Sequence, residues 1–307
     1  MGDKLYLGVD VGGTYTKLGL VNDARRIVSR HTIPSQGFSD KAFFARELLA
    51  ALSFLLSECG GYLSQIKVAG IGLPGPVDAE RGIVLSLTNI AKWNNFGLVS
   101  YLKRFFSFPV FIENDANCMA LAESQLGAAR GASHVICLTL GTGVGGGLIL
   151  EKKIYRGPFF LGGEVGHVPV ALSGKHCPCG GEACLERYVG NGAITARIKK
   201  EFARTLSLEE VSSLARRGDR KAIKIWDDMG RYIGFALSGV VNVLNPEVIV
   251  VGGGVSLAGD VLMRPIKRSL CKHVMKHLKG KVKVKRALLG NDAGVLGAAL
   301  LAKEKIE

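Results

Sequence analysis

The chain has 307 residues, 48% of them hydrophobic, with 41 glycines and a formal net charge of +14. This composition fits one large or two ordinary α/β domains. No apolar run is long enough to span a bilayer and no signal-peptide core follows the N-terminus, so we expect a cytoplasmic protein without a membrane partner. The seven cysteines, three of them clustered, do not resemble a disulfide framework and fit a reducing compartment with one metal site.

The positive charge is concentrated between Arg264 and Arg286, where ten Lys or Arg occur without an acidic residue. A solvated helix face and an edge strand protected by lysines account for most such stretches. Attraction of an anionic substrate such as ATP, or of nucleic acid, is the alternative. The stretch has no motif that reads bases, so we predict no nucleic-acid partner.

The N-terminal segment predicts a β-meander. Leu5 to Asp10 is a short apolar run, residues 12–14 form a glycine turn, and the apolar pattern resumes after Lys17. Residues 26–33 are predicted as a third strand, so the first strand is followed by two more strands and not by a helix. Ser39 is then expected to cap a helix.

That helix is predicted to run to about Cys59, and two buried strands follow it at residues 67–73 and 110–112. Further along, Ser207 opens a capping-box pattern, and residues 219–243 have the apolar spacing of a long helix. Residues 247–251 and 282–288 are the last predicted strands.

The opening pattern recurs about 130 residues later. Leu7–Val21 and Leu138–Leu150 both consist of a strand, a glycine turn and a strand, which predicts two related α/β halves. We expect a small N-terminal domain over residues 1–109 and a large C-terminal domain over 110–293. The last helix, about 294–307, is expected to pack back on the small domain.

The glycine turns are the first candidate site. Glycines in a tight hairpin let backbone N–H groups approach phosphate oxygens, and a threonine adds a hydroxyl donor. Each turn alone is explained at least as well by a glycine turn that only closes a β-hairpin. Two such turns, one of them beside a carboxylate, favour phosphate binding. The predicted nucleotide-binding residues are Asp10, Gly12, Gly13, Thr14, Lys17, Gly141, Thr142, Gly143, Gly252, Gly253 and Gly254.

Asp10, at the end of the first strand, can hold Mg²⁺ directly or through water, because this ion binds few carboxylates and keeps its waters.

A Rossmann fingerprint is excluded at residues 141–145, since a strand rather than a helix follows. Residues 252–254 lie between a strand and a helix. An adenine or ribose could lie against them, and a close strand–helix crossing is the alternative.

Asp115 is the candidate general base. With Asn114 it lies just past the carboxyl end of a strand, where α/β proteins bind ligands. A carboxylate there can accept the proton of a substrate hydroxyl as the hydroxyl attacks phosphorus. An Asx turn that caps the next helix is the alternative, and the two phosphate turns favour catalysis.

Three clustered cysteines predict a metal site. Cys177, Cys179 and Cys184 have the spacing C-x-C-x4-C, and His167 lies ten residues upstream. A Cys3His set closes a tetrahedral structural zinc site and leaves no open position for catalysis. We therefore predict Zn²⁺ on these four residues, with His176 as the rival histidine.

Two carboxylates, Glu164 and Glu186, bracket the cysteines. Bidentate carboxylates suit the vicinal hydroxyls of a sugar. His167 could bind zinc with one ring nitrogen and reach a ligand with the other. These three residues are the predicted sugar contacts of the loop.

Six motifs in this order resemble the ROK (repressor, open reading frame, kinase) family, and most of all its bacterial glucokinase branch. The resemblance covers nearly the whole chain. The motifs are Asp10-x-Gly12-x-Thr14, Glu113-Asn114-Asp115-Ala116-Asn117, Leu140-Gly141-Thr142-Gly143-x-Gly145, Gly163-Glu164-x-Gly166-His167, Cys177-x-Cys179-Gly180-x3-Cys184-x-Glu186 and Gly252-Gly253-Gly254.

The resemblance implies an α/β, two-domain actin-like ATPase (ribonuclease H-like) fold with an interdomain active-site cleft. It also implies a homodimer and ATP-dependent phosphorylation of a hexose, usually at O6. Asp115 resembles the family's catalytic base, and the cysteine loop resembles its zinc site. Residues that resemble its sugar contacts are Asn114, Asp115, Glu164, His167 and Glu186. The chain departs from the family pattern at Ala183, where Gly is frequent, and at Gly190, where Ser is frequent.

We expect a kinase that converts glucose and ATP to glucose 6-phosphate and ADP. A kinase for an N-acetylated hexosamine or another hexose shares every motif and stays open, as does polyphosphate as the phosphoryl donor. A sugar-responsive transcriptional regulator of the same family is the third possibility. Such regulators add an N-terminal helix-turn-helix, for which a first strand at about Lys4 leaves no room.

Overall fold

The computed structural model describes residues 4–87, 90 and 92–307, and the chain divides into two compact units. Each unit contains one five-stranded sheet. Because the chain passes between the units four times, neither unit is a single continuous segment. Unit 1 consists of Met1–Ala122, Arg156–Gly162 and Asn291–Glu307, and unit 2 consists of Glu123–Tyr155 and Gly163–Gly290.

The sheet of unit 1 has the strand order β3-β2-β1-β4-β7. β1, β2 and β3 are antiparallel neighbours, which confirms the predicted meander, and β4 and β7 continue the sheet in parallel. Because β7 pairs with β4, unit 1 extends past residue 109 to Ala122. The strands are β1 (Leu5–Val11), β2 (Tyr15–Asn22), β3 (Ile27–Pro34), β4 (Ile66–Leu73) and β7 (Val110–Asn114).

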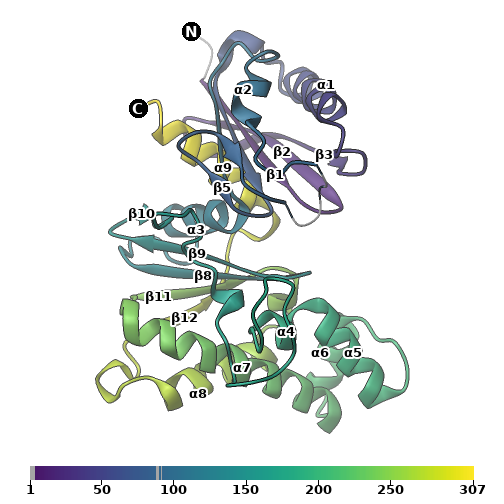
Figure 1. Cartoon of the computed structure of the whole chain (residues 1–307), viewed down its shortest axis with the longest axis vertical. Helices are drawn as coiled ribbons and strands as arrows, with labels where there is room; N and C mark the ends of the chain where they lie inside the picture. Colours follow the sequence, from purple (N-terminus) through teal and green to yellow (C-terminus); the bar gives the residue numbers. More distant parts are fainter. Residues whose placement is uncertain (1–3, 88–89, 91) are drawn as a thin grey trace. The chain divides into compact units, whose positions relative to one another are not determined.

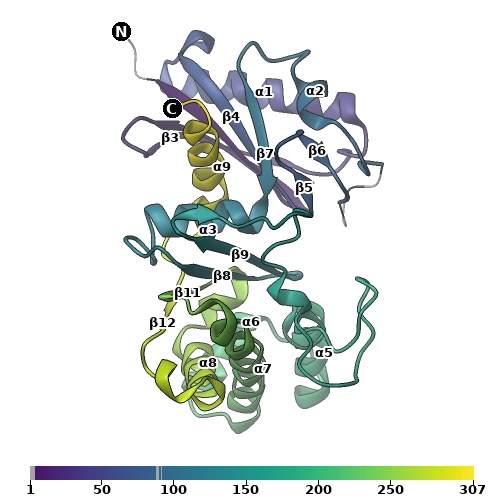
Figure 2. The same ribbon diagram turned by 60° about the vertical axis from the view of Figure 1, so that its left-hand side comes forward.

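Two helices cover the sheet of unit 1. α1 (Lys41–Cys59) packs on β2 and β3, and α9 (Ala293–Glu304) returns from the far end of the sequence to pack on β1, β2 and β4 (Figure 2). The predicted cap of α1 is wrong by one residue. Asp40, not Ser39, accepts hydrogen bonds from the first backbone N–H groups of the helix. Shorter elements of this unit are β5 (Val77–Asp78), β6 (Ile83–Val84), α2 (Leu98–Leu102) and two 3-10 turns, η1 (Leu63–Gln65) and η5 (Gly290–Asp292), the second starting on the last residue of unit 2.

A row of glycines lets α9 approach this sheet closely. Gly8 of β1 pairs in register with Gly19 of β2 and Gly70 of β4. A Cβ atom at Gly8 would lie 2.1 Å from the carbonyl oxygen of Val295, and one at Gly70 would lie 1.8 Å from that of Ala298. The helix backbone therefore lies directly on the sheet, and no side chain fits between them.

Gly70→Ala is expected to destabilise the protein by about 3 kcal/mol or more, because the added methyl meets backbone atoms that cannot move aside. The urea midpoint measures the change. Gly239→Ala is the control, since this exposed glycine lies in a helix with no atom near the added Cβ. That control should stabilise by about 0.5–1 kcal/mol. Equal midpoints for the two variants would contradict the close contact of α9.

The sheet of unit 2 has the order β10-β9-β8-β11-β12 (Figure 1). When the strands of each five-stranded sheet are numbered in chain order, both sheets have the order third, second, first, fourth, fifth. Each also opens with an antiparallel hairpin across a glycine turn, which confirms the predicted internal repeat. The strands are β8 (Val135–Leu140), β9 (Val144–Leu150), β10 (Lys153–Ile154), β11 (Val248–Gly252) and β12 (Lys283–Arg286).

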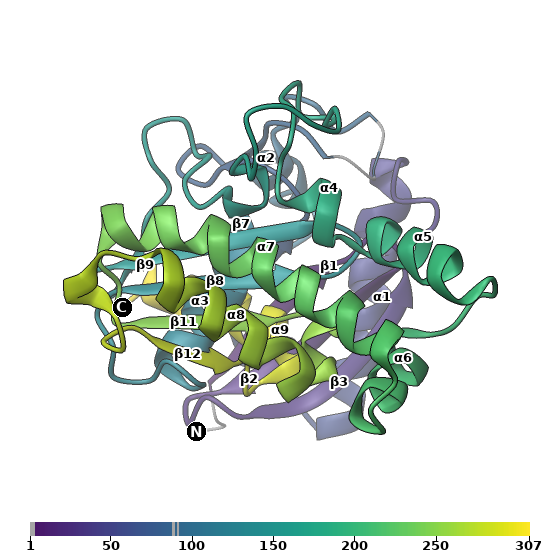
Figure 3. The same ribbon diagram turned by 90° about the horizontal axis from the view of Figure 1, so that it is seen from below.

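Helices α7 (Arg220–Leu244) and α8 (Asp260–His273) run side by side along the sheet of unit 2 (Figure 3). α7 begins after Asp219, whose side chain caps it, close to the predicted start. The capping box at Ser207 is also confirmed. The other elements are α4 (Glu186–Val189), α5 (Asn191–Phe202), α6 (Leu208–Arg216), η2 (Val165–His167), η3 (Gly254–Ala258), η4 (Lys276–Leu278) and α3 (Asp115–Gln125), which starts in unit 1.

None of the helices in the described part of the chain combines the length and the apolar character needed to cross a lipid bilayer.

Candidate active site

The first glycine turn joins β1 to β2 in unit 1. The Gly12 N–H donates to the Tyr15 carbonyl at 3.1 Å, and the Ser35 hydroxyl donates to the Gly12 carbonyl at 2.6 Å. A pocket of about 680 Å³ opens beside the turn at Gly13 and Thr14. The turn is thus held from one side and open on the other, as a phosphate-binding turn requires.

Asp10 is the last residue but one of β1, and it is half-buried. Burial raises the pKa of Asp10, and the charge of Lys17, its partner across the ladder, offsets part of this rise. The first turn of α9 lies against it, since a Cβ atom at Gly294 would be 2.4 Å from the Asp10 Cγ. An ionised carboxylate in this position is costly unless a cation neutralises it, which fits the predicted Mg²⁺ contact.

Asp10→Asn should therefore raise the melting temperature at pH 7–8. Because the folded-state pKa of Asp10 is raised, its ionisation destabilises the folded protein at high pH, and this cost disappears when the carboxylate is protonated. The gain in melting temperature from Asp10→Asn should therefore shrink as the pH falls toward about 4. Thermal melts across this pH range, without added divalent metal, measure the difference. A gain that is constant with pH would contradict the assignment to Asp10 ionisation.

Asn114 and Asp115 lie where β7 ends and α3 begins. The Asn114 Oδ1 accepts hydrogen bonds from the N–H groups of Ala116 and Asn117 at 3.0 and 3.1 Å, so the Asx cap considered above is present. The Asn114 amide also donates to the Gly75 carbonyl at 3.2 Å. These bonds fix the start of the helix and place Asp115 in its first turn, at the positive end of the helix dipole.

The four predicted zinc ligands come together in unit 2. Their donor atoms all lie within 4.8 Å of one another, and this group contains His167 and not His176. The Cys179 and Cys184 Sγ atoms are 3.7 Å apart, and the Cys177 Sγ lies 3.7 Å from the His167 Nδ1. Zinc–sulfur bonds of about 2.3 Å in a tetrahedron place two sulfurs about 3.8 Å apart. The residues therefore fit a structural zinc ion.

The structure shows why Gly suits position 183 and Ser suits position 190, the two positions where this chain departs from the family pattern. Ala183 adopts a left-handed backbone with φ of 55°, the conformation that glycine accepts most readily. Gly190 has the extended conformation of an N-cap before α5, but it offers no side chain to cap the helix. A serine at this position would supply the missing oxygen.

The carboxylates around the cysteine loop converge. The Glu164 Oε2 lies 3.8 Å from the His167 Nε2, so the ring presents Nδ1 to the cysteines and Nε2 to Glu164. Burial raises the pKa of Glu164, while His167 lowers it and Glu186 raises it. The Glu186 Oε2 accepts a hydrogen bond of 2.8 Å from the Val144 N–H. Glu186 therefore links the predicted sugar loop to the second glycine turn.

The other predicted nucleotide residues of unit 2 also lie together. Gly253 has a left-handed φ of 79°, and a Cβ atom there would lie 2.2 Å from the Leu140 carbonyl oxygen. The third glycine turn thus packs against the strand end that leads into Gly141. A 3-10 turn, η3, begins at Gly254, the last glycine of this run, and α8 comes after it. Thr142 borders a pocket of about 290 Å³ beside Glu186.

The predicted site residues are therefore divided between the units. Unit 1 holds Asp10, Gly12, Gly13, Thr14, Lys17, Asn114 and Asp115. Unit 2 holds Gly141, Thr142, Gly143, Glu164, His167, Cys177, Cys179, Cys184, Glu186, Gly252, Gly253 and Gly254.

Comparison with known proteins decides the family, since residues 6–305 match the ROK family. The chain belongs to the ROK family. It is 36% identical to a glucokinase of Halalkalibacterium halodurans over 99% of this chain and 97% of that one. It is 34% identical to a glucokinase of Thermotoga maritima over 98% of both chains.

The solved ROK family glucokinase of Streptomyces griseus, in complex with glucose and AMPPNP, has a TM-score of 0.84 to this ROK protein. The two are 32% identical, over 98% of this chain and 99% of that one. The predicted α/β, two-domain actin-like ATPase fold is therefore confirmed, and so is the family resemblance.

The sequence did not identify one buried ion pair of this ROK protein. The Glu113 side chain is 2% exposed; its Oε2 accepts a hydrogen bond from the Arg156 Nε at 2.7 Å and lies 2.6 Å from the Arg156 Nη2. The other Glu113 oxygen accepts from the Asn114 N–H and the Asn117 amide, both at 3.0 Å. The pair thus fastens the segment around Arg156 to the residue that precedes Asn114 and Asp115.

Glu113→Gln is expected to destabilise the protein by about 3 kcal/mol, because it leaves the Arg156 charge without its partner in a largely buried site. Adding Arg156→Met should recover much of the loss. Urea unfolding measures both variants. The control is Arg264→Gln, which breaks a pair exposed on both sides and should change little. A double variant no more stable than Glu113→Gln would contradict the coupling.

Proposed function

We propose that this chain is an ATP-dependent hexose kinase that converts glucose and ATP to glucose 6-phosphate and ADP. The observation that carries the proposal is the hydrogen bond from Val144 to Glu186. It joins a loop with the chemistry of sugar recognition to a turn with the chemistry of phosphate binding. The glucokinases at 34–36% identity over nearly the whole chain support the same reaction.

The proposal assigns the sugar to Asn114, Asp115, Glu164, His167 and Glu186. Carboxylates accept hydrogen bonds from adjacent hydroxyls, and an imidazole nitrogen can accept or donate one, which fixes the orientation of the ring. Zn²⁺ on His167 and the three cysteines would hold the loop in shape and take no part in the chemistry.

The triphosphate is assigned to the N–H groups and threonines of the two hairpin turns, and the nucleoside to residues 252–254. Mg²⁺ at Asp10 would neutralise charge on the phosphates. Asp115 accepts the proton of the sugar O6 hydroxyl while O6 bonds to the γ-phosphorus. The bond from that phosphorus to the bridging oxygen breaks, and ADP leaves with the electron pair.

We further propose that the enzyme acts in the cytoplasm as a homodimer, as the family resemblance implies. Light scattering on the purified protein measures the oligomeric state.

A coupled assay of ADP release over a panel of sugars tests the reaction. The panel contains glucose, mannose, fructose, N-acetylglucosamine and N-acetylmannosamine, and polyphosphate replaces ATP in a second series. Glucose with ATP should give the highest kcat/KM. A preference for an acetylated sugar would replace glucose in the proposal. No turnover with any sugar, together with a gel shift on DNA at physiological salt, would favour the regulator instead.

A further inference from the structure

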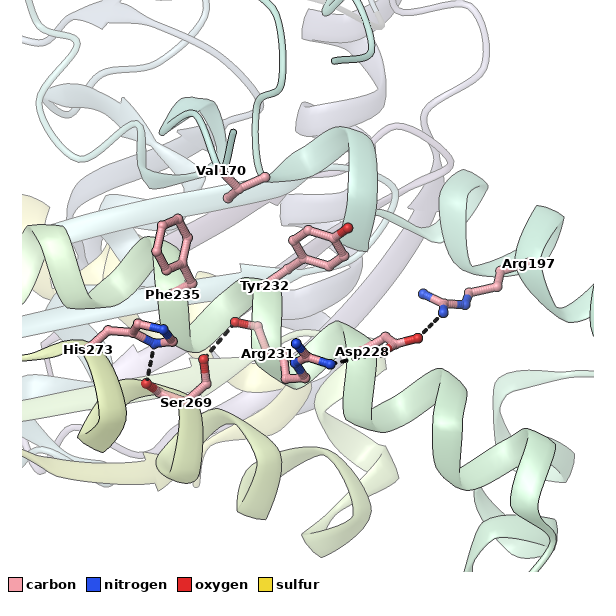
Figure 4. A pocket seen from close by; sticks show the side chains of 8 residues that line it. All are labelled: Val170, Arg197, Asp228, Arg231, Tyr232, Phe235, Ser269 and His273. Carbon is pink, nitrogen blue, oxygen red and sulfur yellow. Dashed lines mark hydrogen bonds and ion pairs between the residues drawn. The ribbon is translucent and has the colours of Figure 1, made fainter. Parts of the chain in front are cut away.

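A pocket of about 370 Å³ lies among the helices of unit 2, lined by residues of α5, α7 and α8 (Figure 4). Arg231, Ser269 and His273 also line an adjoining pocket of about 360 Å³. None of the lining residues is assigned above to the sugar, the nucleotide or the metal. The volume is in the range of small-molecule sites.

The first pocket is lined by one carboxylate, Asp228, and two arginines, Arg197 and Arg231. Asp228 pairs with Arg197, with Lys224 at 2.9 Å and with Arg231 at 3.7 Å. Burial raises the pKa of Asp228, but the Lys224 hydrogen bond and the Arg197 charge outweigh it and leave that pKa below its usual value. Asp228 therefore stays ionised and holds its cationic partners in place, but its one negative charge does not balance the two arginines, Arg197 and Arg231, that line the pocket with it.

The adjoining pocket adds further positive charge. Arg268 pairs with Asp227, and Lys272 lines the same pocket. Together the two pockets are lined by two carboxylates and four cationic side chains, Arg197, Arg231, Arg268 and Lys272, which leaves a surplus of two positive charges. A dianionic phosphate would be attracted by such a surplus, and arginine donors match its oxygens in pairs.

Aromatic rings form another part of the lining. Tyr232 packs at a tilt against Tyr188 with ring centres 4.8 Å apart, and Phe235 and His273 form a T-shaped pair with ring centres 5.1 Å apart. The His273 Nδ1 lies 2.8 Å from the Ser269 carbonyl oxygen, to which it donates. These contacts fix the rings, so an apolar or ring-shaped body could rest against a preformed surface.

We propose that this pocket binds a small phosphate ester, with its phosphate on Arg231, Arg268 and Lys272 and its organic body against Tyr232 and Phe235. The site would be separate from the residues that carry out turnover. The proposed site would also give a role to two residues of the basic stretch Arg264–Arg286, because Arg268 and Lys272 line the adjoining pocket.

Binding of phenyl phosphate, glucose 6-phosphate and inorganic phosphate to the full chain tests the proposal. Isothermal titration at low and at physiological salt compares the wild type with Arg231→Gln/Arg268→Gln. The control is Arg264→Gln/Lys279→Gln, which removes the same charge at exposed positions outside both pockets. We expect the pocket variant to weaken ester binding at least tenfold, and the control to change it less than about twofold.

Phe235→Ala separates the two parts of the site. It should weaken phenyl phosphate several-fold and leave inorganic phosphate unchanged. Equal loss of binding in the pocket variant and the control would overturn the proposal. So would esters that bind no better than inorganic phosphate, which would indicate an adventitious ion only. A change of oligomeric state in the pocket variant with unchanged ester affinity would identify a subunit contact and overturn it as well.

Discussion

Replacing Asp115 by Asn should lower kcat by about three orders of magnitude, within the range that a general base contributes. The side-chain amide cannot accept the proton of the sugar hydroxyl. It can still accept the hydrogen bond of 2.8 Å that the Ala116 N–H donates to the Asp115 Oδ1. The fold and the start of α3 should therefore survive, and the loss should fall on the chemical step.

Three measurements separate this result from a loss of structure. Single-turnover kinetics should show the slow step, glucose affinity should remain within a few-fold of the wild type, and the urea midpoint should change little. Asp23→Asn is the matched control, since Asp23 is an exposed carboxylate of the same unit that pairs with Lys303. A kcat for Asp115→Asn near that of the wild type would rule out Asp115 as the base.

Features set by nearby residues could be predicted from the sequence. The strand, turn and strand pattern depends on alternating apolar residues and on glycines within about fifteen positions, and both hairpins form as expected. The four predicted metal ligands come together because one short segment, His167 to Cys184, contains all of them. The catalytic candidate at Asp115 follows from its place after a strand.

Features that depend on distant residues could not be predicted. Glu113 was known only as a carboxylate beside Asn114, and its partner Arg156 is 43 positions away. A carboxylate in or next to a buried strand needs a cationic or hydrogen-bonding partner, and this need is the one signal that the sequence offers. Which residue becomes the partner depends on the fold. The glycines Gly8, Gly19 and Gly70 are a second example. Glycine inside a strand indicates that another part of the backbone comes close, but only the fold shows that this part is α9.

The bond between Glu186 and Val144 is the most useful of these distant contacts. The sequence predicts the cysteine loop and the second glycine turn as separate sites, and Glu186 is 42 residues from Val144. Their direct contact means that the shape of the loop also affects the turn. A metal that holds the loop should therefore influence both sugar binding and phosphate binding.

Cys184→Ser should remove the zinc, about one ion per chain in the wild type, and raise the KM for glucose by at least about tenfold. Cys184 lies two residues before Glu186 in the sequence, and His167 lies three after Glu164. Without the metal, the carboxylates keep their chemistry but lose the framework that orients them. Metal analysis, steady-state kinetics and thermal melts on the same preparation measure the effect.

Cys271→Ser is the matched control, because Cys271 is exposed and lies outside the ligand group. It should keep its metal, its KM and its melting temperature. Chelation of the wild type should reproduce the Cys184→Ser defect, and added Zn²⁺ should reverse it in the wild type alone. A metal-free wild type with full activity and stability would remove zinc from the proposal. It would leave the hydrogen bonds of the loop itself to orient Glu164, His167 and Glu186.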